Sequence, residues 1–154
     1  MRYINRIFTA VIICVAAVVM SSCGKIAEIN SAELAERLNS SVAFSEHLTE
    51  IEDTAAEKRF YLNPGEYTEM TAFVGTKATC DEFAIIKTND TEAVKTKLRG
   101  HLETMKENYS TYRPAEAQKT DSALLEEYKD TVVLIVSGDN TNAAAVYDEY
   151  IRGK

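Results

Sequence analysis

The stretch Val132-Val133-Leu134-Ile135-Val136 contains five consecutive apolar residues with no polar residue between them. Successive side chains of a β-strand point to opposite faces of the sheet, so a strand with one exposed face alternates apolar and polar residues. The uninterrupted run therefore predicts a strand that is covered on both faces. Ser137-Gly138-Asp139-Asn140 closes this strand and leads into a last helix, predicted over residues 141–152.

Two further strands are predicted upstream of this core strand. Tyr67–Val74 and Glu82–Thr88 are rich in β-branched and aromatic residues. Only Gly75–Asp81 links them, and so short a link favours an antiparallel hairpin over a crossover. The direction of the core strand relative to the hairpin is open; a parallel arrangement would require a right-handed crossover through the intervening helices.

Helical periodicity is strongest over residues 92–112, where apolar residues recur every three or four positions. Asn30 and Glu33 have the spacing of a capping box and predict a helix start. A second helix is expected over about residues 45–60. Pro114 ends or kinks the long helix, and a shorter helix is expected after it, starting at about Ala115 or Asp121. The apolar residues of that shorter helix would be Leu124, Leu125 and Tyr128.

The N-terminus has the organisation of a bacterial secretion signal. Arg2 and Arg6 precede an apolar segment over residues 7–20, which is shorter than the roughly 20 residues that a membrane-spanning helix needs. Ser21-Ser22-Cys23-Gly24 resembles the lipobox of bacterial lipoproteins, in which the cysteine is modified with diacylglycerol and becomes the first mature residue. We therefore expect a lipid on Cys23 that anchors the protein at the extracytoplasmic face of the cell membrane, because two acyl chains give stable anchoring. The alternative is a secreted protein with an incidental cysteine.

Composition indicates one domain behind this anchor. Removal of residues 1–22 leaves 132 residues, and without Arg2 and Arg6 the net charge changes from −7 to −9. A surface with this much negative charge repels nucleic acids and anionic lipid headgroups. We therefore expect no nucleic-acid partner, and we expect membrane attachment to come from the lipid on Cys23.

Cysteine usage leaves a single thiol. Cys14 leaves with the signal peptide and Cys23 carries the lipid, so Cys80 remains and no intramolecular disulfide is available. Cys80 is either a small buried apolar residue or a nucleophile, although no base lies near it in the sequence.

The expected fold is a small single-domain α+β (or α/β) two-layer sandwich, in which helices cover the hairpin and the core strand. Residues 1–22 form the removed signal peptide, residues 23–30 the lipidated N-terminus and a short tether, and residues 31–154 the globular domain.

Few residues present themselves as a functional site. Asp139 and Asn140 lie between the core strand and the last helix, where open α/β sheets bind ligands, but capping of that helix is the favoured interpretation. His47 and His101 lack a second ligand at metal-binding spacing, and no catalytic, metal or cofactor motif is present, so no cofactor is expected. Seven tyrosines fall in the mature domain.

Three of these tyrosines, Tyr109, Tyr112 and Tyr128, could form one interaction patch or could border a small core.

Several segments together resemble one family of small bacterial lipoproteins, domain of unknown function 4358. They are residues 70–87, Tyr112-Arg113-Pro114 and the core strand up to Gly138-Asp139. The likeness extends from about Phe60 to Tyr150 and is most specific over residues 78–87. The family usually has alanine at the position of Cys80, which suggests a packing role. The resemblance implies a location in the cell envelope, and it offers no established activity and no functional residues.

Two hypotheses about function follow. The first is a non-catalytic binding or accessory protein of the cell envelope, which holds a protein partner or a small ligand near the membrane and exposes a tyrosine-rich patch. The second is a small envelope enzyme or ligand-binding domain, with a concave site that includes Asp139 and a second titratable group.

Overall fold

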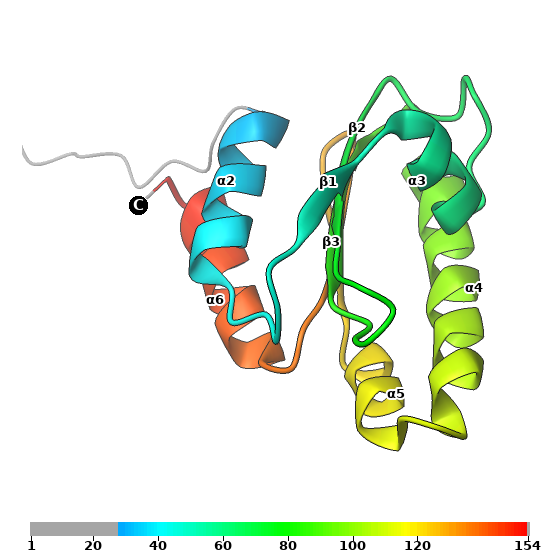
Figure 1. The fold of residues 1–154 in the computed structure, drawn as a ribbon. Helices are drawn as coiled ribbons and strands as arrows, with labels where there is room; N and C mark the ends of the chain where they lie inside the picture. Colours follow the sequence, from blue (N-terminus) through cyan, green and yellow to red (C-terminus); the bar gives the residue numbers. More distant parts are fainter. Residues whose placement is uncertain (1–27, 154) are drawn as a thin grey trace, which may run out of the picture.

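A computed structural model describes residues 28–153, shown in Figure 1. The predicted signal peptide, Cys23 and most of the tether lie outside the described residues. The helices are α2 (Ser31–Ser41), α3 (Asp53–Phe60), α4 (Thr91–Ser110), α5 (Pro114–Asp121) and α6 (Asn140–Ile151). The strands are β1 (Thr49–Ile51), β2 (Glu69–Val74), β3 (Glu82–Lys87), β4 (Leu124–Tyr128) and β5 (Thr131–Val136). Within the described range, no helix is both long and apolar enough to cross a bilayer.

The five strands form one antiparallel sheet in the order β1-β2-β3-β5-β4. The predicted hairpin is confirmed as β2 and β3, with Phe73 opposite Phe83. The core strand is β5, and it lies antiparallel to β3, with Ala84 opposite Leu134. The sheet therefore contains no parallel crossover, and β5 is reached from β3 through α4, α5 and β4.

Apolar side chains cover both faces of the sheet. On one face, which we call the α2/α6 cluster, Phe83, Ile85, Val133 and Ile135 pack with those two helices. On the other face, the α3/α4/α5 cluster, Ala84, Ile86, Val132, Leu134 and Val136 pack with the remaining helices. Figure 1 shows the sheet nearly edge-on between these two groups of helices.

The expected α+β class is confirmed, but the layers differ from expectation. The domain has three layers instead of two. Because β5 and β3 are apolar on both faces, a layer of helices must shield each face of the sheet from water.

Residues 49–51 and 124–128 lie in regions predicted as helix and are strands. Leu48 packs in the α2/α6 cluster and Ile51 packs against the opposite cluster, which a strand allows because residues three apart point to opposite faces. The adjacent Leu124 and Leu125 divide between the clusters in the same way. The helical interpretations of residues 45–51 and of residues 124–128 were therefore wrong, and only α3 and α5 remain of them.

Local polar contacts begin α2 and α4. Asn30 accepts a hydrogen bond from the backbone N–H of Glu33 at 3.1 Å, which confirms the predicted start of α2. Asp90 accepts one from Ala93 N at 3.0 Å at the start of α4. Side-chain acceptors at this position satisfy backbone donors that the first helical turn leaves unpaired.

The ring of Phe83 is fully buried between Phe73 and Phe44, with ring centroids 4.8 Å and 5.9 Å away. We expect Phe83→Ala to lower the free energy of unfolding by about 3–5 kcal/mol, because it leaves a cavity in the layer between the sheet and α2. Urea unfolding followed by circular dichroism measures this. Tyr112→Ala is the control, since that side chain is 86% exposed and its loss should change stability by less than about 0.5 kcal/mol. Equal unfolding midpoints for the two variants would contradict this assignment of the core.

Candidate functional site

A hollow of about 500 Å³ opens between α3, α4 and the loop that joins β2 to β3. Four cationic side chains line it, from Lys58, Arg59, Lys77 and Arg113, together with the tyrosines Tyr61, Tyr109 and Tyr112. No aspartate or glutamate is among its lining residues. We call it the basic hollow, and it contrasts with a chain that has 24 acidic and 17 basic residues.

A buried carboxylate holds one side of the basic hollow in place. The Glu82 side chain is completely buried, and its Oε2 accepts hydrogen bonds from Nε and Nη2 of Arg59, both at 2.5 Å. Its Oε1 lies 2.5 Å from Nε2 of His101. A buried carboxylate is tolerated only when paired and hydrogen-bonded, so Glu82 fixes both partners.

His101, for which the sequence offered no second metal ligand, is buried against Glu82. His47 is exposed and takes no part. The sequence did not indicate that Glu82 is a buried ion-pair partner, because a glutamate at the start of a strand is usually exposed. The sequence signal for it was the pair of acidic residues Asp81 and Glu82 directly before an apolar run.

The opposite wall of the hollow is tied to the β2–β3 loop. The Tyr109 hydroxyl donates to the carbonyl of Thr79 at 2.6 Å, and Nη1 of Arg113 donates to the carbonyl of Ala78. These contacts fix the C-terminal part of α4, and the residues after it, against the loop that carries Lys77.

Glu46 organises the same loop from the other side. Its carboxylate accepts hydrogen bonds from the hydroxyl groups of Thr79 and Thr76 and from the Thr76 N–H, the last at 2.9 Å. The bond from Thr79 contributes most to holding the pKa of Glu46 below its usual value. Gly75 permits this arrangement, since a Cβ there would lie 2.7 Å from Glu46 Oε1.

The structure brings together two of the three tyrosines of the proposed patch. Tyr109 and Tyr112 both line the basic hollow, whereas Tyr128 packs against the α2/α6 cluster across the sheet. Tyr61 is the third tyrosine that lines the basic hollow. It ends α3 with φ 59°, a left-handed conformation that non-glycine residues rarely adopt, and it is 48% exposed. No sequence pattern indicated its role, because it depends on how α3 lies against α4.

Asp139 and Asn140 serve the start of α6. Asp139 Oδ1 accepts from the backbone N–H of Asn142 at 2.9 Å and caps the helix, and Asn140 Nδ2 donates to the Ser122 hydroxyl at 2.6 Å. Ser137 Oγ and Asn140 Oδ1 are buried without a hydrogen-bond partner in the described part of the chain. Neither Asp139 nor Asn140 lines the basic hollow.

Cys80, Asp81 and Glu116 place one sulfur and two carboxylate oxygens within 4.8 Å of one another, which is a spacing that could hold a metal ion. The ammonium of Lys119, however, lies 2.7 Å from Asp81 Oδ1 and 2.9 Å from Glu116 Oε2. It already supplies the positive charge that the two carboxylates need. Burial opposes the charge on Lys119, but these contacts outweigh it and raise the Lys119 pKa.

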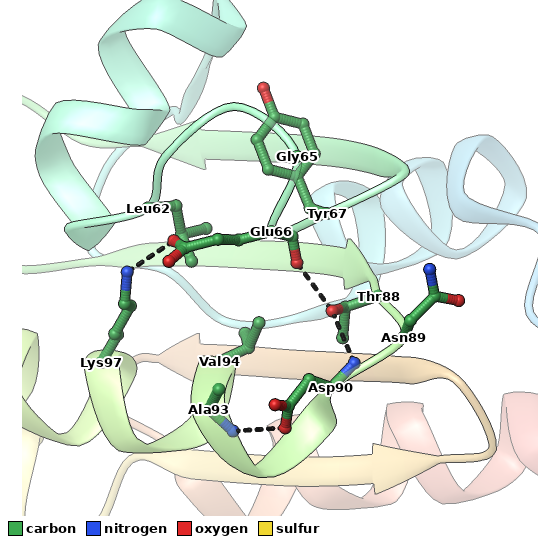
Figure 2. Close-up of a pocket in the computed structure, with 10 residues that line it drawn as sticks. All are labelled: Leu62, Gly65, Glu66, Tyr67, Thr88, Asn89, Asp90, Ala93, Val94 and Lys97. Carbon is green, nitrogen blue, oxygen red and sulfur yellow. Dashed lines mark hydrogen bonds and ion pairs between the residues drawn. The ribbon is translucent and has the colours of Figure 1, made fainter.

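A second hollow, of about 250 Å³, lies beside the start of α4 and is drawn in Figure 2. The dashed lines there show that its polar groups bind one another. Glu66 pairs with Lys97 at 2.5 Å, Thr88 Oγ1 donates to the Glu66 carbonyl at 2.7 Å, and Asp90 N donates to Thr88 Oγ1 at 3.0 Å. The hydrogen bond from Lys97 is the main reason that the pKa of Glu66 falls to about 2. With its charges paired, this hollow offers mainly apolar contacts, from Leu62 and Val94.

Comparison with known proteins identifies the family and nothing more specific. The sequence profile described as "Domain of unknown function (DUF4358)" matches residues 40–137, which is more than half of the chain. The chain belongs to this family, as its motifs suggested. The matched range contains all five strands and every residue that lines the basic hollow. No curated protein matches the chain, and no solved structure matches it either.

Burial, followed by the negative charge of Glu116, raises the pKa of the Cys80 thiol from 9.0 to about 12. We expect its alkylation by iodoacetamide at pH 8 to be about 1,000-fold slower in the native protein than in the unfolded chain, because only the thiolate reacts. The thiol form stabilises the fold below pH 9, and that contribution should be lost as the pH rises from 9 towards 12. Mass-spectrometric mapping of the Cys80 peptide distinguishes it from Cys14 and Cys23. Rapid native labelling of Cys80 at pH 8 would instead indicate an activated nucleophile.

Proposed function

We propose that the protein is a lipid-anchored binding or accessory protein of the bacterial cell envelope, non-catalytic, with the basic hollow as its binding site. The observation that carries this proposal is the gathering of four cations and three tyrosines, without a carboxylate, around one hollow in a chain of net charge −7. Tyrosine and arginine are enriched at binding sites because they combine apolar contact with hydrogen bonding.

A binding role fits the groups at the basic hollow better than catalysis does. Its histidine is committed to Glu82, and the hydroxyl of Thr104 donates to the carbonyl of Gly100 at 3.0 Å. Among the described residues, its lining therefore presents no nucleophile hydrogen-bonded to a base, which acyl and phosphoryl transfer by a side chain would need.

The alternative, an enzyme or ligand site near Asp139, has one observation in its favour, the two unpartnered oxygens of Ser137 and Asn140. It has less support, because the Asp139 carboxylate is already used to cap α6.

The lipid anchor is tested by labelling cells with a radioactive fatty acid. The wild-type protein and Cys80→Ala should incorporate label, and Cys23→Ala should incorporate none, because the thiol of Cys23 is the acceptor of the diacylglyceryl group. Labelled Cys23→Ala protein would contradict the anchor.

The binding site is tested by photo-crosslinking in intact cells, with a photoreactive residue in place of Tyr112. We expect a defined adduct that disappears when Lys58 and Lys77 are changed to glutamine. A photoreactive residue in place of Ala145, which is exposed on α6 across the sheet, is the matched control and should give no such adduct. The same adducts from both positions, or none from position 112, would refute the assignment of the site.

A further inference from the structure

We infer that the basic hollow binds a phosphate ester group. The inference rests on the proposed function in one respect, since it takes the hollow as the ligand site, and it adds the chemical class of the ligand.

The first argument is that three of the four cations in the hollow lack an anionic partner, whereas Arg59 is paired with Glu82. Within residues 28–153, neither Lys58, Lys77 nor Arg113 has a carboxylate within 4.0 Å, since none of them takes part in an ion pair there. Other lysines of the domain do have carboxylate partners, namely Lys87, Lys95, Lys97, Lys106 and Lys119. Uncompensated charge is therefore gathered where the surface is hollowed, and an anion would complete it.

The second argument is that the two arginines, and the loop that carries Lys77, are held in position before a ligand arrives. Arg59 uses Nε and Nη2 for Glu82, which leaves its Nη1 group uncommitted to that carboxylate. Arg113 is held by Ala78, and the loop that carries Lys77 is held by Glu46 and Tyr109. Preorganised donors lose little conformational entropy on binding, which is the property of a built site.

The third argument concerns which anion fits. Lys58 and Arg59 come from α3, Lys77 from the β2–β3 loop and Arg113 from the segment between α4 and α5, so the charges approach from three separate segments. A carboxylate carries one charge and two oxygens in a plane and is satisfied by a single guanidinium fork. A phosphate ester carries up to two charges and several oxygens in a tetrahedral arrangement, which lysines recognise as point charges.

The tyrosines and the size of the hollow describe the remainder of the ligand. Tyr61 and Tyr112 present exposed rings with polar hydroxyl groups, suited to a sugar or polyol that has both apolar and hydroxyl-bearing faces. A hollow of about 500 Å³ admits such a small ester. A nucleic acid would meet repulsion from the acidic remainder of the domain.

The test is calorimetric titration of the full-length protein, held in phosphatidylcholine nanodiscs, with glycerol 3-phosphate at constant ionic strength. Lys58→Gln/Lys77→Gln should weaken binding by about tenfold or more, since charge-assisted hydrogen bonds are lost. The matched double variant Lys87→Gln/Lys106→Gln removes the same charge outside the hollow and should weaken binding less than about twofold. Lys58→Arg/Lys77→Arg should retain most of the affinity.

The source of the phosphate ester is resolved by adding phosphatidylglycerol to the nanodiscs. Weaker apparent binding of glycerol 3-phosphate to the wild type would show that the lipid headgroup competes for the hollow. Unchanged binding would indicate a soluble ester. Both results support the inference.

Three results would overturn it. They are equal affinity for succinate, equal weakening by the two glutamine double variants, and no measurable binding of glycerol 3-phosphate. If that last result comes with an intact adduct from position 112, the inference fails and the proposed binding site stands; if the adduct is also absent, both fail.

Discussion

The burial of β3 and β5 on both faces is the constraint on which the rest of the structure depends. Two neighbouring antiparallel strands with apolar residues on each side cannot be satisfied by a single layer of helices. The chain therefore places α2 and α6 on one face and α3, α4 and α5 on the other. The outer strands β1 and β4 then complete the sheet at its two edges.

Two buried carboxylates at the start of β3 connect this sheet to the helices. Asp81 accepts from the backbone N–H of Ser45 and pairs with Lys119 of α5, while Glu82 pairs with Arg59 of α3 and with His101 of α4. A buried carboxylate without partners would be costly, so these pairs fix where the three helices lie against the sheet. The basic hollow follows from that placement, because Arg59 and His101, which line it, are the partners of Glu82.

The distribution of charge over the domain indicates a local basic region that the net charge of the chain does not reveal. The chain as a whole is acidic, and most lysines of the domain with described contacts pair with carboxylates, so the surface near them is electrically balanced. The lining of the basic hollow is different, since among the described residues only Arg59 of its four cations is paired with a carboxylate, the buried Glu82. Net charge argues against a polyanion wrapped around the domain, but it does not describe this local excess of positive charge.

Patterns within single segments were sufficient for the α+β class, the β2–β3 hairpin, the core strand β5, the long helix α4 and the family. Each of these depends on periodicity, capping residues or motifs close together in the chain, which the sequence displays directly. Only the tertiary structure decided that Leu124 and Leu125 belong to a strand, that Tyr128 lies apart from Tyr109 and Tyr112, and that Glu82 is buried beside Arg59 and His101. These features depend on which segments, far apart in sequence, meet across the sheet, and a contact between distant segments leaves no periodic pattern in either of them.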